Sequence, residues 1–156
     1  MTIYAKDVMV TDFDTIHQNA PIEEAINIIL DGKVRKSGHK TISLIAVDDY
    51  GQLAGVISMY DILYHFRPDF LNLSLDADSF SWSGQLKGFV DALKGKQVNQ
   101  LMSMNVMKAS LDDHIMVILD HMVKNKYRRL PVLDGNKPIG IIYVSDVYYS
   151  IFKSLK

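Results

Sequence analysis

The sequence contains no cysteine, which excludes disulfide bonds, thiolate metal sites and cysteine nucleophiles. Net charge is almost absent as well, because 17 Lys and Arg against 18 Asp and Glu leave a formal charge of −1. This balance removes the general electrostatic argument for a nucleic-acid-binding or membrane-surface protein. Neither a nucleic acid nor a membrane is therefore expected as a partner.

Long hydrophobic runs are also missing. No apolar stretch approaches the roughly 18 residues that a bilayer-spanning helix needs, and Asp7 interrupts the region where a secretory signal would be apolar. We expect a soluble protein of a reducing cytoplasm. The composition, 48% hydrophobic and 22% charged over 156 residues, is that of an ordinary globular chain with a sizeable core.

Motifs that carry catalysis are absent too. The sequence has no G-x-G-x-x-G, G-x-S-x-G or H-E-x-x-H. Its five histidines are scattered, without the spacing of a metal site. The sequence therefore predicts a protein that is not an enzyme and holds no metal or other cofactor.

What the sequence does contain is an internal repeat. Residues 47–61 (VDDYGQLAGVISMYD) align without a gap on residues 132–146 (VLDGNKPIGIIYVSD), an offset of 85 positions. Residues 9–22 align on residues 102–115 at an offset of 93, so the first copy carries eight extra residues, near 31–40. Such self-similarity decides the architecture before any single motif does.

Each copy has the pattern of a short strand, a helix, a hairpin and a closing helix. In the first copy, helical spacing starts at Ile22, the hairpin strands are 43–47 and 53–58, and the closing helix is 61–66. In the second copy the helix starts at Ile115, the strands are 130–133 and 138–144, and the closing helix is 146–153.

Helix caps and a connecting helix complete this interpretation. Asp61 and Asp146 are predicted to cap the closing helices, and Asp112 or Asp113 the second copy's first helix. The stretch between the copies is apolar enough to pack on them through a helix, whose expected contact residues are Trp82, Leu86, Phe89, Val90 and Leu93.

Two segments carry a resemblance to a known family. Residues 8–25 (VMVTDFDTIHQNAPIEEA) and 128–146 (RRLPVLDGNKPIGIIYVSD) resemble the opening and closing patterns of a tandem pair of CBS domains, a Bateman module. The resemblance implies a mixed α/β (α+β) fold in which two β-α-β-β-α repeats pack through their sheets with pseudo-two-fold symmetry. It places a first motif at 1–67, a linker at 68–99 and a second motif at 100–156.

The resemblance also implies a function. Family members are regulatory modules that bind AMP, ADP or ATP, and in some cases S-adenosylmethionine, in clefts between the two motifs. For this chain it implies a stand-alone module that signals through homodimerisation, or through docking to a regulated protein whose identity the sequence does not give.

Transferred position by position, the family pattern gives two clefts. The first cleft is expected to bind ligand through Ser58, Asp61, Met102, Val106, Met107, Arg128 and Arg129. The second cleft is expected to use Asp14, Thr15, Ser43, Leu44 and Asp146. The chemistry agrees, since a carboxylate accepts hydrogen bonds from ribose hydroxyls, arginine suits phosphate, and adenine needs an apolar slot.

The two clefts are not equivalent. In the second, Tyr143 replaces the serine, and Ser43-Leu44 stand where the first has two arginines. We therefore predict that the first cleft binds a phosphorylated adenosine, while the second is weaker, binds something less charged, or is empty. The basic cluster between Lys33 and Lys40 is either a solvated loop or a segment that swings toward the second cleft.

Plainer roles remain open for these residues. The two aspartates are also explained as helix caps alone, and the two arginines as charges that complement a helix dipole. Two alternatives to a nucleotide sensor remain: a structural dimerisation or interaction module without ligand, and an S-adenosylmethionine binder.

Overall fold

The computed structural model describes residues 2–73 and 76–156, so residues 74 and 75 of the expected linker lie outside the described part. The first copy follows the predicted order of elements: β1 (Thr15–His17), α2 (Ile22–Asp31), β2 (Ser43–Val47), β3 (Leu53–Ser58) and α3 (Met59–Phe66). The second copy repeats it: β4 (Ala109–Ser110), α6 (Ile115–Asn125), β5 (Arg129–Asp134), β6 (Lys137–Tyr143) and α7 (Val144–Phe152).

Several short elements surround the two repeats: α1 (Ala5–Val8), α4 (Leu86–Leu93), α5 (Val98–Leu101) and 3-10 turns at Asp69–Leu73, Ala77–Ser79 and Lys153–Leu155. Within the described residues, no helix is both long and apolar enough to cross a membrane.

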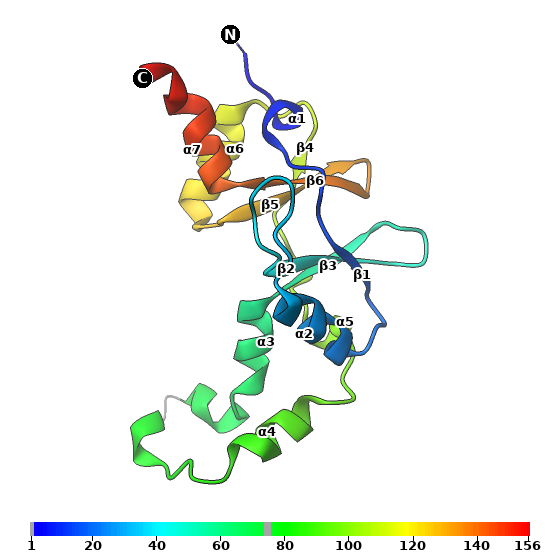
Figure 1. Ribbon diagram of the computed structural model, residues 1–156, viewed down its shortest axis with the longest axis vertical. Helices are drawn as coiled ribbons and strands as arrows, with labels where there is room; N and C mark the ends of the chain where they lie inside the picture. The colour runs from blue at the N-terminus through cyan, green and yellow to red at the C-terminus, as the bar shows by residue number, and fades with distance from the viewer. Residues whose placement is uncertain (1, 74–75) are drawn as a thin grey trace.

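The two sheets confirm the predicted fold class. Each has three strands, the first parallel to the second and the second antiparallel to the third, in the orders β1-β2-β3 and β4-β5-β6. Ile45, Ile141 and Tyr143 form a shared core cluster in which side chains from both sheets meet. Figure 1 shows the sheets one above the other, with α6 and α7 beyond one sheet and α2 and α3 beyond the other.

The segments that lead into each copy pack on the opposite copy. Residue Val10, before β1, forms a β-bridge with Ile141 of β6, and Ser103, before β4, forms one with Val56 of β3. Helix α1 accordingly belongs to the core of the second copy, whereas α5 belongs to that of the first. This exchange brings residues of the 103–107 segment next to the end of β3.

Two glycines make this exchange possible. A Cβ added to Gly55 would lie 2.7 Å from the Ser103 carbonyl oxygen and 2.8 Å from Met102 Sδ. One added to Gly140 would lie 3.0 Å from the Val10 carbonyl oxygen and 2.7 Å from Met9 Sδ. The crossing segments therefore lie against bare backbone in both copies.

Because a methionine side chain moves more easily than a backbone carbonyl, the two glycines should differ in sensitivity. Gly55→Ala is expected to lower the free energy of unfolding by about 2 kcal/mol, and Gly140→Ala by about 1 kcal/mol. Urea denaturation of both variants measures the difference. Equal losses, or a larger one at Gly140, would contradict this account of the packing.

The predicted helix caps are wrong, because α3 and α7 start directly where the preceding strands end. Ser58 is the N-cap of α3, and Asp61 stands at its third position, where its carboxylate accepts the Ser58 N–H at 2.9 Å. In α7 the N-cap is Tyr143, which places Asp146 at the third position as well. Helix α6 is capped by His114, whose Nδ1 accepts the Met116 N–H at 3.0 Å.

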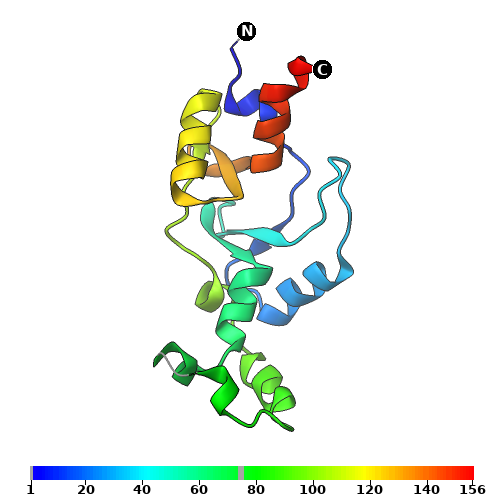
Figure 2. The ribbon, with the colours of Figure 1, turned by 90° about the vertical axis from the view of Figure 1, so that its left-hand side faces the viewer.

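The connecting helix is shorter than expected. Helix α4 starts at Leu86, so Trp82 precedes it and joins an aromatic cluster with Phe70, Phe80 and Phe89. The helix packs on the first copy through buried Leu93 and an edge-to-face contact between Phe89 and Phe66, while its Leu86 and Val90 are exposed. Figure 2 shows this connection at the end of the molecule opposite both termini.

Candidate functional site

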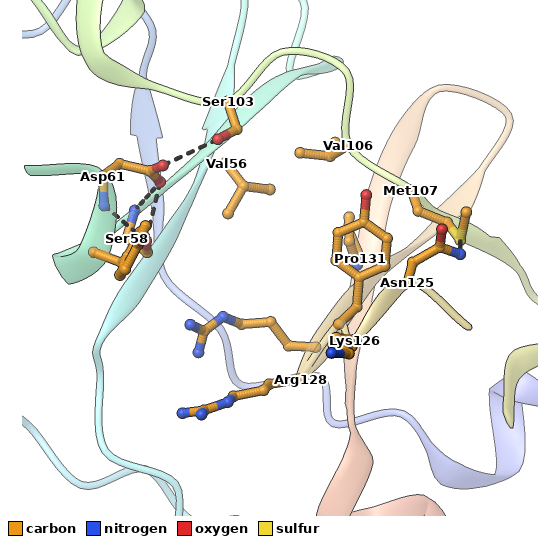
Figure 3. Close-up of a pocket in the computed structure, with 13 residues that line it drawn as sticks. Val56, Ser58, Asp61, Ser103, Val106, Met107, Asn125, Lys126, Arg128 and Pro131 are labelled. Carbon is orange, nitrogen blue, oxygen red and sulfur yellow. Dashed lines mark hydrogen bonds between the residues drawn. The ribbon is translucent and has the colours of Figure 1, made fainter. Parts of the chain in front are cut away.

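A cavity of about 540 Å³ lies between the two copies, at the place expected for the first cleft. Its walls come from the end of β3, the start of α3, the 103–107 segment, the end of α6 and the start of β5 (Figure 3). The lining residues are Val56, Ser58, Tyr60, Asp61, Ser103, Val106, Met107, Asn125, Lys126, Tyr127, Arg128, Arg129 and Pro131. A volume in this range is typical of small-molecule sites.

One carboxylate, that of Asp61, is held in a fixed orientation at the cavity wall. Its Oδ2 accepts hydrogen bonds from the Ser58 N–H at 2.9 Å and the Ser58 hydroxyl at 3.0 Å. Its Oδ1 accepts one from the Ser103 hydroxyl at 3.0 Å, and Figure 3 shows these bonds on one side of the cavity. A carboxylate has about four acceptor positions, so Asp61 keeps capacity for a further donor.

Three cationic side chains, those of Lys126, Arg128 and Arg129, line the same cavity. Arg129 is half-buried, and this burial lowers the pKa of its guanidinium; Tyr143 and the carboxylate of Asp61 oppose the shift, and neighbouring Arg128 adds to it. None of the three has a carboxylate within ion-pair distance in the part of the chain that the structure describes. A bound anion could therefore pair directly with cations that no described carboxylate contacts at ion-pair distance.

The remaining wall is apolar. Val56, Val106, Met107 and Pro131 line the cavity, and Figure 3 shows Val106 and Met107 on the segment that crosses from the first copy to the second. An apolar slot beside a fixed carboxylate and three cations suits a flat heterocycle joined to a sugar and a phosphate.

Six of the seven residues predicted for the first cleft line this one cavity. The exception is Met102, whose side chain lies against Gly55 and the core of the first copy. The six are Ser58, Asp61, Val106, Met107, Arg128 and Arg129. Their role in binding stays a prediction, whereas their convergence is a property of the fold.

Several lining residues were not predicted from the sequence. Ser103 orients Asp61 from the opposite copy, and Lys126 adds a third cation from a left-handed backbone position with φ of 56°. Asn125 and Tyr127 flank Lys126 at the end of α6. A left-handed residue other than glycine is uncommon, but no side-chain pattern in the sequence announces it.

The second cleft is arranged differently. The carboxylate of Asp14 accepts hydrogen bonds from Arg35 Nη2 and the Thr41 hydroxyl, both at 2.7 Å. Partial burial raises the pKa of Asp14, but these two bonds and the charge of Arg35 outweigh it and hold that pKa below its usual value. Asp14 is therefore an ionised partner of Arg35 at neutral pH.

The other predicted residues of the second cleft do not converge on an open cavity. Ser43 and Leu44 are buried, and Leu44 belongs to the core of the first copy. Thr15 is exposed at the start of β1. Asp146 does face this cleft, where its Oδ2 lies 3.1 Å from His39 Nε2.

The chain matches known proteins along most of its length. A family model described as CBS domain matches residues 5–67 and 98–153. CBS domain-containing protein CBSX2, chloroplastic, from Arabidopsis thaliana is 31% identical over 146 residues. That match covers 85% of this chain and 59% of the relative, so the chain spans little more than half of the relative's length.

Solved structures share the fold. The crystal structure of CBSX2 in complex with AMP has a TM-score of 0.70 at 21% identity. The match covers 98% of this chain and 98% of that chain. The CBS domain pair of protein MJ0100, in complex with methylthioadenosine and S-adenosylmethionine, has a TM-score of 0.67 at 23% identity with full coverage of both chains. The cytosolic domain of the Mg²⁺ channel MgtE in complex with ATP has a TM-score of 0.65 at 19% identity, over 94% of this chain and 48% of that one.

Both copies of the repeat are thus matched by the same family model, and their packing through two sheets is that of solved CBS pairs. The chain belongs to the CBS domain family and is a tandem CBS domain pair.

Proposed function

We propose that this chain is a regulatory module that binds an adenine nucleotide, AMP, ADP or ATP, in the first cleft. The observation that carries the proposal is the cavity itself, which combines one oriented carboxylate, three unpaired cations and an apolar wall. Two proteins of similar fold support this class of ligand: CBSX2 was solved in complex with AMP, and the cytosolic domain of MgtE in complex with ATP.

Each part of a nucleotide has a partner in this arrangement. The ribose hydroxyls would donate to Asp61, where one of them competes with the exposed Ser103 hydroxyl for Oδ1. The phosphate would lie against Arg128, Arg129 and Lys126, and adenine would lie against Val106 and Met107. S-adenosylmethionine, which carries positive charge, fits three cations poorly, so we favour a phosphorylated ligand.

Binding without catalysis fits the lining. Asp61 is the one carboxylate among the lining residues, and the lining contains no histidine to act as a general base. We infer that the ligand acts by stabilising one relative arrangement of the two copies, an effect often worth about 1–3 kcal/mol. The cytoplasmic location stays a prediction, since the Arabidopsis relative is chloroplastic by name.

The direct test is thermal unfolding of the purified chain with AMP, ADP, ATP and adenosine. A ligand present at one hundred times its dissociation constant is expected to stabilise the fold by about 2.7 kcal/mol, which raises Tm by several degrees. At equal concentration, AMP, ADP and ATP should each raise Tm more than adenosine does. Unchanged Tm with all four ligands would reject nucleotide binding and favour the structural dimerisation or interaction module.

We also propose that the chain forms a homodimer through its closing helices. Tyr64 of α3 and Tyr148, Tyr149 and Phe152 of α7 are between 45% and 66% exposed, which leaves large aromatic rings in water. Helices α3 and α7 lie on the same side of the molecule in Figure 1, so one partner surface reaches both. The regulated protein would then dock on this dimer.

Light scattering at tens of micromolar, a range typical of weak association, is expected to give twice the monomer mass of 17.7 kDa. Tyr149→Lys should return the chain to a monomer, because it places a charge in the apolar contact. Tyr50→Lys is the matched control, since Tyr50 is 87% exposed at the β2–β3 turn. A monomeric native chain would rule the dimer out.

A further inference from the structure

The second cleft is filled by the chain's own segment 33–40, which contains the extra residues of the first copy. After α2 the chain rises toward the second copy and returns to β2, and both ribbon views show its turn at the level of β6 and the start of α7 (Figures 1 and 2). The segment is a small hairpin, closed by a bridge between Val34 and Lys40 and by the Arg35 N–H bound to the His39 carbonyl at 3.0 Å.

Two side chains of this hairpin point into the second cleft while its other long side chains face water. Arg35 is 8% exposed and His39 is partly buried, whereas Val34, Lys36 and Lys40 are exposed. A merely solvated basic loop would not bury its arginine. Of the two roles left open by the sequence, the swing into the second cleft is the one that the fold realises.

The imidazole of His39 engages the aspartate of the second cleft, which leaves this carboxylate less available to a ligand. Its ring stacks on that of Tyr143, with centroids 3.8 Å apart and planes inclined by 15°. Its Nε2 lies 3.1 Å from Oδ2 of Asp146, the aspartate that corresponds in the repeat to Asp61. The bond to this carboxylate corresponds to the one proposed for the ribose hydroxyls at Asp61, whereas the stacking on Tyr143 has no counterpart in the first cleft, where the repeat has Ser58.

Arg35 secures the hairpin but is incompletely satisfied. Its guanidinium donates to Asp14 at 2.7 Å and to the Tyr143 hydroxyl at 3.0 Å, while its Nε is buried without a hydrogen-bond partner among the described residues. A buried donor without a partner costs free energy, so the filled state is less stable than its ion pair alone suggests. Release of the hairpin would return this donor to water.

The residues that line the second cleft once the hairpin is displaced would disfavour a phosphate-bearing ligand. Without the hairpin, the cleft presents the carboxylates of Asp14 and Asp146 beside the Tyr143 ring. The positions that carry arginine in the first cleft are the buried Ser43 and Leu44 here. Two neighbouring carboxylates repel an anion and suit a neutral or cationic ligand.

We propose that the second cleft is a nucleoside site closed by the chain's own Arg35 and His39, and that it takes a phosphate-free adenosine compound once this hairpin is displaced. The inference deepens the proposed function, because the ligand class follows from the repeat relation between the two clefts. It predicts one nucleotide for each native chain, bound in the first cleft. A second, phosphate-free ligand has to displace His39.

The test is calorimetric titration of adenosine and S-adenosylmethionine, with AMP for comparison, into native chain, His39→Ala and the control Lys36→Ala. Lys36 lies on the same hairpin but faces water. If the hairpin fills the cleft in at least nine-tenths of the molecules, removing the His39 ring should raise the affinity for adenosine and S-adenosylmethionine about tenfold or more. Lys36→Ala is expected to behave like the native chain, and AMP should gain no second site.

Two further variants assign the gain to a cleft. Adding Asp146→Asn to His39→Ala should abolish it, whereas adding Asp61→Asn should not. An unchanged affinity in His39→Ala, or a gain that depends on Asp61, would overturn the inference. A native chain that fails to bind AMP would reject the proposed function of the first cleft, yet leave an Asp146-dependent gain as support for this one.

Nuclear magnetic resonance of the native chain provides a test that needs no variant to fold. The ring protons of His39 should be shifted upfield by the stacked Tyr143 ring. Excess adenosine should return them to the positions of an exposed histidine. Ring protons without the upfield shift, or a shift that saturating adenosine leaves in place, would contradict a displaceable occupant.

Discussion

Replacing Asp61 by asparagine is expected to weaken AMP binding about 100-fold, whereas the same change at Asp146 leaves AMP binding unchanged. Asparagine loses the charge that strengthens the hydrogen bonds from the ribose hydroxyls, and its NH₂ group turns a donor toward them. Asp146 occupies the corresponding position of the second copy, but its carboxylate is engaged by His39. The pair of variants therefore compares equal chemistry in an open and a filled cleft.

The measurement is calorimetric titration of AMP into the native chain and the two variants. Because Asp61 also completes the capping box of α3, its replacement is expected to cost about 1 kcal/mol of stability, well short of unfolding the domain. Circular dichroism before titration separates a misfolded variant from a folded one that has lost its ligand. Equal losses in Asp61→Asn and Asp146→Asn would show that the clefts are equivalent and reject the assignment.

Ser103 offers a finer comparison within the same cleft. Its hydroxyl donates to Oδ1 of Asp61 at 3.0 Å, the oxygen that a ribose hydroxyl would otherwise share. The repeat alignment pairs Ser103 with Val10, which has no hydroxyl, so the sequence offered no pattern by which to select it. The contact forms because the lead-in segments cross between the copies. This crossing is a long-range feature that local sequence patterns do not encode.

The repeat made most of the architecture predictable from the sequence. Helical spacing after Ile22 and Ile115 and the two hairpins reproduced the element order, with boundaries within two residues at the strands. The N-caps failed for a physical reason. Both closing helices begin directly at the strand end, so the aspartates fall one turn inside the helix.

The predicted residues converge on one cavity where a position in the repeat fixes the side chain's direction, and they do not where the chain departs from the repeat. Asp61 and Arg129 follow from strand ends, whereas Met102 was expected in the first cleft and instead lies against Gly55. The contacts of Arg35 and His39 depend on where an insertion folds back. Their spacing in the sequence allowed a solvated loop equally well, and only the tertiary structure distinguishes the two.

Replacing Arg129 by methionine is expected to lower AMP affinity about 10- to 100-fold while leaving adenosine affinity within about twofold. Arg129 is half-buried at the start of β5, and the loss of solvation that lowers the pKa of its guanidinium also strengthens its attraction for a phosphate. Methionine keeps the length and apolar stem of the side chain, so the variant removes the charge with little loss of packing.

Arg128→Met is expected to have a smaller effect, because Arg128 is exposed and water screens its charge. Arg67→Met is the control, since Arg67 follows α3 and its guanidinium lies 5.6 Å from the Tyr64 ring rather than in the cavity. The measurement is the ratio of AMP to adenosine affinity in each variant. If Arg129→Met weakens adenosine as much as AMP, the arginine supports the fold of the cleft and does not contact the phosphate; a selective loss of AMP places the phosphate at Arg129.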